Sequence, residues 1–433
     1  MTPVQVAALG PAFAAYLREF EDCFVQDRTR EHLHTYCRGL LSDLPRKSVE
    51  PIALAAGTAV RTLQEFLRDH VWHRERLRDR LQRHVASRLP APADDLGCVG
   101  IIDETSQAKK GTKTPGVQRQ WCGSVGKMEN CVVTVHLGIA CGPFKTLLDA
   151  DLFLPKVWSR DRDRCREAGI PDGVAYRPKW RIALEQLDRC QANGLHLDWL
   201  TFDEGYGGKP AFLADLDTRP GLCYVGEVPR NFRCLTKRPK GRPPPGGFKG
   251  KRADNLARCS AALNRQQWQG VTLARLTLAD QQWEVRAGPV YLLRDGRPTQ
   301  RTYWLIVGRN LTTAEVKYFV SNAPPDAPLE KLLRVAFRRW NVEHTFRVGK
   351  SEIGFGHFEG RSYVALLRHL ILCLLVLGFV AEHTERLRGE KSGDHVGAGV
   401  PGAEPAVRGL ADEPPGDIGV GAYQCGHCLS PVA

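Results

Sequence analysis

CVGIID, residues 98–103, is the first of three short apolar segments that set the fold, and CVVTVHLGIA (131–140) and FKTLLDADLFLP (144–155) follow it. Each segment is rich in β-branched or other apolar residues, and Gly-rich and Lys-rich turns separate them. Runs of this length and composition, bounded by turn residues, are typical of buried strands. We therefore expect three consecutive β-strands.

The chain then alternates between helical and strand patterns. PKWRIALEQLDRCQANG (178–194) has helical spacing and ends at a glycine of the kind that terminates helices. LDWLTFD (197–203) predicts a strand, KPAFLADLD (209–217) a helix, and CYVGEV (223–228) a further strand. Three strands followed by strand and helix in alternation predict an α/β fold built on a mixed sheet.

The regions around this sheet differ from it in composition. Residues 12–90 alternate apolar and charged positions at helical spacing, and RLPAPADD (88–95) reads as a linker. Residues 228–252 carry nine Lys or Arg without an acid and predict a flexible cationic loop, whereas 268–322 predicts more strands. The predicted divisions are a helical N-terminal domain (1–92), an α/β core in two parts (93–230 and 329–388), the basic loop with a β-rich insertion (231–328), and a disordered tail (389–433).

The amino-acid composition indicates which kind of partner and which cellular compartment to expect. Lys and Arg number 61 against 48 Asp and Glu, a formal charge of +13. This excess favours nucleic acid through counterion release, although a merely basic soluble protein would have the same balance. The 14 cysteines form no disulfide framework and the N-terminus lacks a secretory pattern, so we expect reduced thiols in the cytoplasm. The apolar run LILCLLVLGFVA (370–381) is too short to span a bilayer and predicts a buried helix.

Two acids fall where predicted strands end, which is where α/β sheets collect ligands. Asp103 closes CVGIID, and Asp203 closes LDWLTFD. With Glu343, on a predicted helix, they could hold two Mg²⁺ ions, which prefer carboxylate oxygens and can clamp both the attacking and the leaving oxygen of a phosphodiester. Either aspartate alone is equally explained by a strand that ends at solvent.

The helix that carries Glu343 is RWNVEHTFRVGK, residues 339–350. Arg339, Glu343 and Lys350 are separated by steps of four and seven, so their side chains share one face of the helix. A solvated surface helix with salt bridges between successive turns would show the same spacing. Phe337, Trp340 and Phe346 instead indicate that the other faces are buried.

These residues resemble the DDE-superfamily transposases of bacterial insertion sequences, in the branch that carries a Y-x2-R-x3-E-x6-K signature. Arg339, Glu343 and Lys350 match the signature, whereas its tyrosine position holds Ala336. Residues 101–131 are similar to that family's block around the first aspartate, and TFDEGYG (201–207) is similar to the block around the second. GFGHFEGRSYVALLRHLILCLLVLGFV, residues 354–380, is similar to its closing helix.

The resemblance implies an RNase H-like mixed sheet core with a β-rich insertion, preceded by the helical domain. Asp103, Asp203 and Glu343 would be both the catalytic residues and the ligands of two Mg²⁺ ions, with Mn²⁺ as a possible substitute. The expected reaction cuts DNA at the transposon end, and the freed 3′-hydroxyl then attacks target DNA. The expected partners are the terminal inverted repeats and target DNA, both double-stranded, bound by a homodimer in the cytoplasm at the nucleoid, with no membrane.

Further residues are candidates for DNA contacts. Arg339 and Lys350 would hold phosphates beside the scissile bond. The N-terminal helices would recognise the terminal repeats, although a dimerisation or packing module would show the same helical sequence pattern. Lys127 is a further candidate, although a solvated basic turn explains it equally well. Arg238 and Lys240 are candidates in the cationic loop. Trp304 would stack on a displaced base, unless it packs in the core.

Two other functions fit the same residues. One is a transposase-derived DNA-binding protein that no longer cleaves DNA, and the other is a stand-alone nuclease of the same fold. Retention of all three acids argues against the first. The second predicts cleavage without joined products.

Overall fold

The computed structural model describes residues 3–92, 94–273 and 281–393. The last helix, α15 (Tyr363–Gly393), passes the expected end of the core at residue 388. From residue 394 onward the expected tail, with Cys425 and Cys428, lies outside the described residues. The cysteines that are described are all free thiols.

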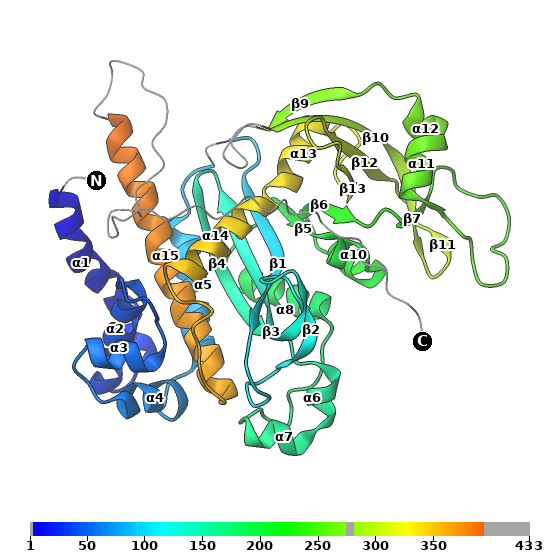
Figure 1. The fold of residues 1–433 in the computed structure, drawn as a ribbon. Coiled ribbons are helices and arrows are strands. Elements are labelled where there is room, and N and C mark those ends of the chain that lie inside the picture. Colours follow the sequence, from blue (N-terminus) through cyan, green and yellow to red (C-terminus); the bar gives the residue numbers. More distant parts are fainter. Residues whose placement is uncertain (1–2, 93, 274–280, 394–433) are drawn as a thin grey trace.

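The N-terminal region is helical, as its periodicity predicts. The helices α2, α4 and α5 pack against α15, and α5 also contacts the sheet, so this region shares a hydrophobic core with the rest of the protein (Figure 1). The helices of the region are α1 (Pro3–Arg18), α2 (Asp27–Leu41), α3 (Val49–Ala55), α4 (Val60–Arg68) and α5 (Arg74–Arg88), with a short helical turn at Glu21–Cys23.

The predicted mixed sheet is confirmed. Its strands lie in the order β4-β3-β1-β5-β6, with β3 antiparallel to both β1 and β4, and with β1, β5 and β6 mutually parallel. A short strand that the sequence patterns missed, β2, pairs with the start of β3. The bounds are β1 (Cys98–Ala108), β2 (Gln118–Cys122), β3 (Lys127–Cys141), β4 (Phe144–Leu152), β5 (Trp199–Phe202) and β6 (Cys223–Val228).

Helices cover the two faces of this sheet. The face that carries Glu104 contacts α8, whereas the face that carries Asp103 contacts α14, because adjacent residues of a strand point to opposite faces. α15 lies on β4 beside α14 (Figure 1). The helices are α6 (Lys156–Arg160), α7 (Arg162–Glu167), α8 (Lys179–Ala192), α9 (Glu204–Gly207), α10 (Pro210–Leu216), α13 (Leu329–Phe337) and α14 (Arg339–Ser351).

The insertion continues the core sheet. Its last strand, β13 (Val316–Ser321), pairs antiparallel with β6, so the paired strands run without a break from the core into the insertion. Figure 1 shows the insertion on the side of the core opposite the N-terminal helices. Its other elements are β7 (Arg233–Leu235), β8 (Lys251–Arg252), α11 (Ala253–Cys259), α12 (Ala261–Asn264), β9 (Gln269–Leu273), β10 (Gln281–Arg294), β11 (Arg297–Pro298) and β12 (Tyr303–Asn310).

α15 is the buried helix that the apolar run predicts. Among the described residues it alone is long and apolar enough to cross a membrane, yet 83% of that stretch is buried inside the protein. Its Arg368 donates to the carbonyls of Phe66 and Leu67 in the last turn of α4 and of Trp72 just beyond that helix. Burial lowers the pKa of this guanidinium to about 10. These hydrogen bonds tie α15 to the N-terminal helices.

A buried ion network joins α8 to the sheet. Arg189 of α8 lies 2.8 Å from Asp149 and also pairs with Asp151, both on β4 and both almost fully buried. The two carboxylates raise the pKa of the guanidinium. Gln82 of α5 donates to Asp149 as well, so the network also fixes the N-terminal region on β4.

Replacing Arg189 with alanine should leave two buried carboxylates without their shared counter-charge. Removing one partner of a buried ion pair costs about 3–5 kcal/mol, and urea unfolding at pH 7 should show a loss of that order. The matched control is Arg181→Ala on the same helix, whose half-exposed guanidinium lies 3.7 Å from Glu185. It should lose less than about 1 kcal/mol. Equal losses would contradict this explanation.

Candidate active site

Asp103 and Asp203 lie side by side where the parallel pairing of two strands stops. β1 and β5 pair from Val99 to Ile102, and the partner of Ile102 is Phe202. The two aspartates are the next residues on each strand. Since neighbouring strands lie about 4.8 Å apart, both carboxylates leave the sheet at one place.

One expectation about Asp103 is wrong. β1 does not end there but continues to Ala108, because β3 remains paired with it as far as Cys131. What ends at Asp103 is the parallel neighbour, β5. Asp203 does end its strand, and it caps the short helix α9 by accepting hydrogen bonds from the N–H groups of Gly205 (2.9 Å) and Tyr206 (3.3 Å).

α14 brings Glu343 to the aspartates through Arg339. One nitrogen of the Arg339 guanidinium lies 2.9 Å from Asp103 Oδ2 and 3.1 Å from Glu343 Oε1. Arg339 and Glu343 are separated by one helical turn and share a face of α14, as their spacing predicts. A single cation therefore bridges an acid of the sheet and an acid of the helix, although they are 240 positions apart in the sequence.

Burial, together with repulsion between the acids, raises the pKa values of both aspartates. Burial, and then the charge of Asp103, raises the pKa of Asp203 to about 6. Burial also raises the pKa of Asp103, against the opposing effect of Arg339. The acids in turn raise the pKa of the Arg339 guanidinium despite its burial. A further cation at this place would relieve the repulsion between the carboxylates.

A third strand contributes an acid that the sequence reasoning missed. Glu227 of β6 contributes to the raised pKa values of Asp203 and Arg339, and it pairs with Lys317 of β13 at 2.9 Å. The sequence could have indicated this acid, because Glu227 lies near the end of CYVGEV, the predicted strand that follows the one ending at Asp203.

The sequence reasoning also missed two groups near Asp103, the carboxylate of Glu104 and the hydroxyl of Tyr206. Glu104 follows Asp103 directly and pairs with Lys179 of α8 at 2.6 Å. The hydroxyl of Tyr206 is buried without a hydrogen-bond partner, and the charges of Glu104, Asp203 and Asp103 all raise its pKa after the larger effect of burial. The motif TFDEGYG contains this tyrosine, three residues after its aspartate.

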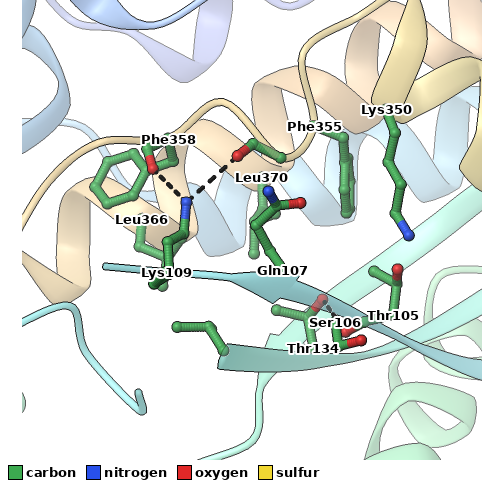
Figure 2. A pocket seen from close by; sticks show the side chains of 12 residues that line it. Thr105, Ser106, Gln107, Lys109, Thr134, Lys350, Phe355, Phe358, Leu366 and Leu370 are labelled. Atoms are coloured by element: carbon green, nitrogen blue, oxygen red, sulfur yellow. Dashed lines mark hydrogen bonds between the residues drawn. The ribbon is translucent and has the colours of Figure 1, made fainter. Parts of the chain in front are cut away.

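Lys350 lies two turns beyond Glu343 and points toward the sheet. Figure 2 shows its side chain reaching from α14 toward Thr105, with Phe355 beside it. Burial lowers the pKa of its amine. The pocket there holds about 30 Å³. That is room for a water molecule or two and not for a nucleotide.

Lys109, on the other side of this pocket, is fully engaged with the protein. It donates to the carbonyls of Phe358 (2.7 Å) and Gly356 (3.3 Å), and burial lowers the pKa of its amine to about 8 (Figure 2). Its role in the structure is to hold the loop between α14 and α15 against β1.

The other predicted contacts lie outside this cluster. Lys127 is exposed at the turn between β2 and β3, 3.6 Å from Glu129. Arg238 and Lys240 are exposed on the loop between β7 and β8, at the outer edge of the insertion (Figure 1). Trp304 of β12 is half-buried, and its indole N–H donates to Pro324 O at 3.0 Å.

Ala336, at the signature's tyrosine position, is buried at the end of α13. Its carbonyl accepts a hydrogen bond from Thr201 of β5 at 3.3 Å. The position therefore helps to hold α13 on the strand that leads to Asp203, and it offers no hydroxyl.

The donor set suits a hard divalent cation. In the described part of the chain, no three acidic, histidine or cysteine side chains already converge on one metal position. Between Asp103 and Glu343 the structure places Arg339 instead, so a cation already lies among the carboxylates. Carboxylate oxygens around a raised-pKa aspartate are the ligands that Mg²⁺ prefers.

The strand order and the helices on both faces define the class: an RNase H-like mixed α/β fold with an acidic cluster at the end of its parallel pairing. The sequence model described as "DDE superfamily endonuclease" matches residues 19–279, well over half of the chain. The chain belongs to the DDE superfamily endonucleases. The matched range includes Asp103 and Asp203 and stops before Glu343.

Two individual proteins are similar to this chain. The "Probable transposase for insertion sequence element IS701" of Microchaete diplosiphon is 27% identical over 368 residues, which are 83% of this chain and 85% of that protein. The piggyBac transposase in its synaptic complex with hairpin DNA, solved by cryo-EM, is 9% identical with a TM-score of 0.44, over 86% of this chain and 69% of that one. The fold assignment rests on the strand order and not on the second similarity.

Replacing Asp203 with asparagine should stabilise the protein at pH 8. The folded state raises the pKa of Asp203 to about 6, against about 3.9 when unfolded. The contribution of this group is favourable below pH 4 and is lost as the pH rises through 6. Asparagine avoids that cost and still caps α9. The gain should approach about 3 kcal/mol at pH 8 and vanish near pH 4.

Urea unfolding in EDTA at the two pH values measures this difference. Glu204→Gln, the exposed neighbouring acid, is the matched control and should show no gain. An Asp203→Asn variant that is no more stable than the parent at pH 8 would contradict the raised pKa of Asp203 described here.

Proposed function

We propose that this chain is a transposase that cleaves DNA at the ends of an insertion element and joins them to target DNA. The observation that carries the proposal is the bridge from Asp103 through Arg339 to Glu343, next to Asp203. It gathers acids from two strands and a helix at one place, with Asp103 buried and Glu343 half-exposed toward solvent. Family membership in the DDE superfamily endonucleases supports a phosphodiester as the substrate.

Asp103, Asp203 and Glu343 would hold Mg²⁺, with Mn²⁺ as a substitute. The metal would supply Lewis-acid activation of the scissile phosphate and of the attacking oxygen. The chain's own residues do the rest: the cap of α9 fixes the Asp203 carboxylate, and the hydrogen bond from the backbone N–H of Glu104 (2.7 Å) fixes that of Asp103. Arg339 and Lys350 offer positive charge to the phosphates beside the cleaved bond.

The charge distribution supports double-stranded DNA as the partner. The net charge is +13, and Arg238, Lys240 and Lys127 are all exposed. We assign the terminal inverted repeats to the N-terminal helices and the insertion, with a homodimer as the unit that acts on DNA. The cytoplasm is the compartment in which such a protein meets the nucleoid. The curated relative's name, a probable transposase, agrees with this assignment.

Asp103→Asn and Glu343→Gln should each abolish DNA cleavage while leaving DNA binding intact. Each change removes a metal-ligand charge and keeps the size of the side chain. The loss should be about 10²-fold to 10³-fold, the range for removing one strong electrostatic stabiliser. Purified protein with Mg²⁺ and duplex DNA carrying the element's terminal repeats provides the assay, read on a denaturing gel for cut and joined strands.

The matched control is Glu352→Gln, an exposed acid just after α14, which should cleave as the parent does. Binding without cleavage by the parent protein would point to a transposase-derived binding protein. Cleavage without joined products would point to a nuclease.

Arg339→Gln should change the response of the protein to Mg²⁺. Without the guanidinium, Asp103 and Glu343 lose their shared counter-charge, so the metal-free Tm should fall. A divalent ion then meets less competing positive charge, and added Mg²⁺ should raise the Tm of this variant more than that of the parent. Differential scanning calorimetry in EDTA and across a Mg²⁺ series measures both effects.

Arg338→Gln is the control, because Arg338 pairs with Asp94 and not with the acidic cluster. It should lower the Tm without enlarging the Mg²⁺ response. If Mg²⁺ raises the Tm of the parent and of an Asp103→Asn variant equally, the assignment of the metal ligands is wrong.

A further inference from the structure

The hairpin formed by β2 and the start of β3 has an apolar outer face. Trp121 and Met128 are directly opposite each other in the register and are 54% and 50% exposed. Val125, in the turn, is 47% exposed. Met128 is the only methionine after the first residue. Large apolar side chains that are exposed together usually mark a binding surface.

The inner face of the same hairpin is buried and fixes its position. Cys122 and Cys131 are fully buried and form a small apolar cluster with Val133. The alternation of β2 therefore places Arg119 and Trp121 together on the outer face, with Cys122 on the inner face. Trp121 is exposed because of this register and not because the hairpin is loosely attached.

The turn of the hairpin is anchored close to the acidic cluster. Ser124 N–H donates to Ser106 Oγ at 3.3 Å, and Ser106 is on β1, three residues after Asp103. Three residues of strand span about 10 Å, which is close to the rise of three nucleotides. Lys350 lies near both places, because burial lowers the pKa of its amine and the charges of Cys122 and of Asp103 act against that effect.

The surroundings of the apolar face are basic. Residues 107–131 contain five Lys or Arg and a single acid, Glu129. Arg119 shares the outer face with Trp121, and Lys127 lies at the turn. A second copy of this chain would bring like charges together. It would also gain little from three apolar side chains, since stable interfaces bury about 800 Å² on each partner.

We propose that Trp121, Met128 and Arg119 form a stacking face for an unpaired base of the DNA, a few nucleotides from the phosphodiester that the acidic cluster cleaves. This inference rests on the proposed function. An aromatic ring stacks on any base, and flanking cations hold the phosphates. Paired bases inside a duplex present no free face, so the occupant is a nucleotide that has left the stack at or near a strand end.

Binding to two synthetic probes in EDTA tests the proposal. One is a fluorescein-labelled 20-base-pair duplex with a 3′ overhang of six thymidines, and the other is the same duplex with blunt ends. Trp121→Ala should weaken binding to the overhang probe about fivefold to 100-fold, from about 1–3 kcal/mol per stacked base. Binding to the blunt probe should change less than twofold.

Matched variants separate stacking from other effects. Trp121→Phe keeps a ring and should retain most of the overhang preference. Arg119→Gln should weaken both probes and reduce the salt dependence of binding. Val157→Ala, an apolar residue of α6 that is 62% exposed and not on the hairpin, should change neither. Since Trp121 is at the surface, all variants should keep the parent's circular dichroism and Tm.

Photocrosslinking locates the contact directly. With 5-iodouracil in the overhang, the crosslink should map to the tryptic peptides 120–127 or 128–145. Crosslinks elsewhere together with an unchanged overhang preference in Trp121→Ala would overturn the proposal. So would a Trp121→Ala variant that only loses self-association by light scattering. Failure of the parent protein to bind either probe would instead overturn the proposed function itself.

Discussion

The geometry of the site depends on the ion pairs that Arg339 makes with Asp103 and with Glu343. The Arg339 side chain is only 16% exposed, and its guanidinium binds Asp103 on the sheet and Glu343 on its own helix. Carboxylates from separate elements repel one another, and Arg339 offsets that repulsion where α14 packs on the sheet through Val342 and Phe346. The arginine therefore supplies the positive charge among these carboxylates, and a metal bound there, as proposed above, would have to compete with it.

The sheet sets the position of the aspartates by a simple rule of pairing. β5 is short and stops at Phe202, whereas β1 continues to Ala108 because it stays paired with β3. Beyond Ile102, β1 therefore has no paired strand on the β5 side, which leaves room there for the side chains of the acids. Glu227 of β6 also lies near Asp203, so three successive parallel strands each deliver an acid to one edge.

Much of this could be predicted from local patterns, because the core strands and α8 have clear apolar periodicity and Asp103 and Asp203 directly follow apolar runs. The continuation of β1 to Ala108 could not be predicted, since ETSQA is polar and depends on its pairing with β3. The strand β2 was missed for the same reason. The direction of Arg339 was also beyond local reasoning: its spacing indicated a shared face, but only the packing of α14 on β1 turns the guanidinium toward the acids and away from solvent.

The pairing of β13 with β6 has a mechanical consequence. The inserted sheet meets the core through hydrogen-bonded strands, reinforced by the Lys317–Glu227 pair, and not through a hinge. A duplex bound to the insertion would therefore be held in a fixed position relative to the core. If the insertion binds the duplex as proposed, the paired strands fix the distance between that contact and the acidic cluster.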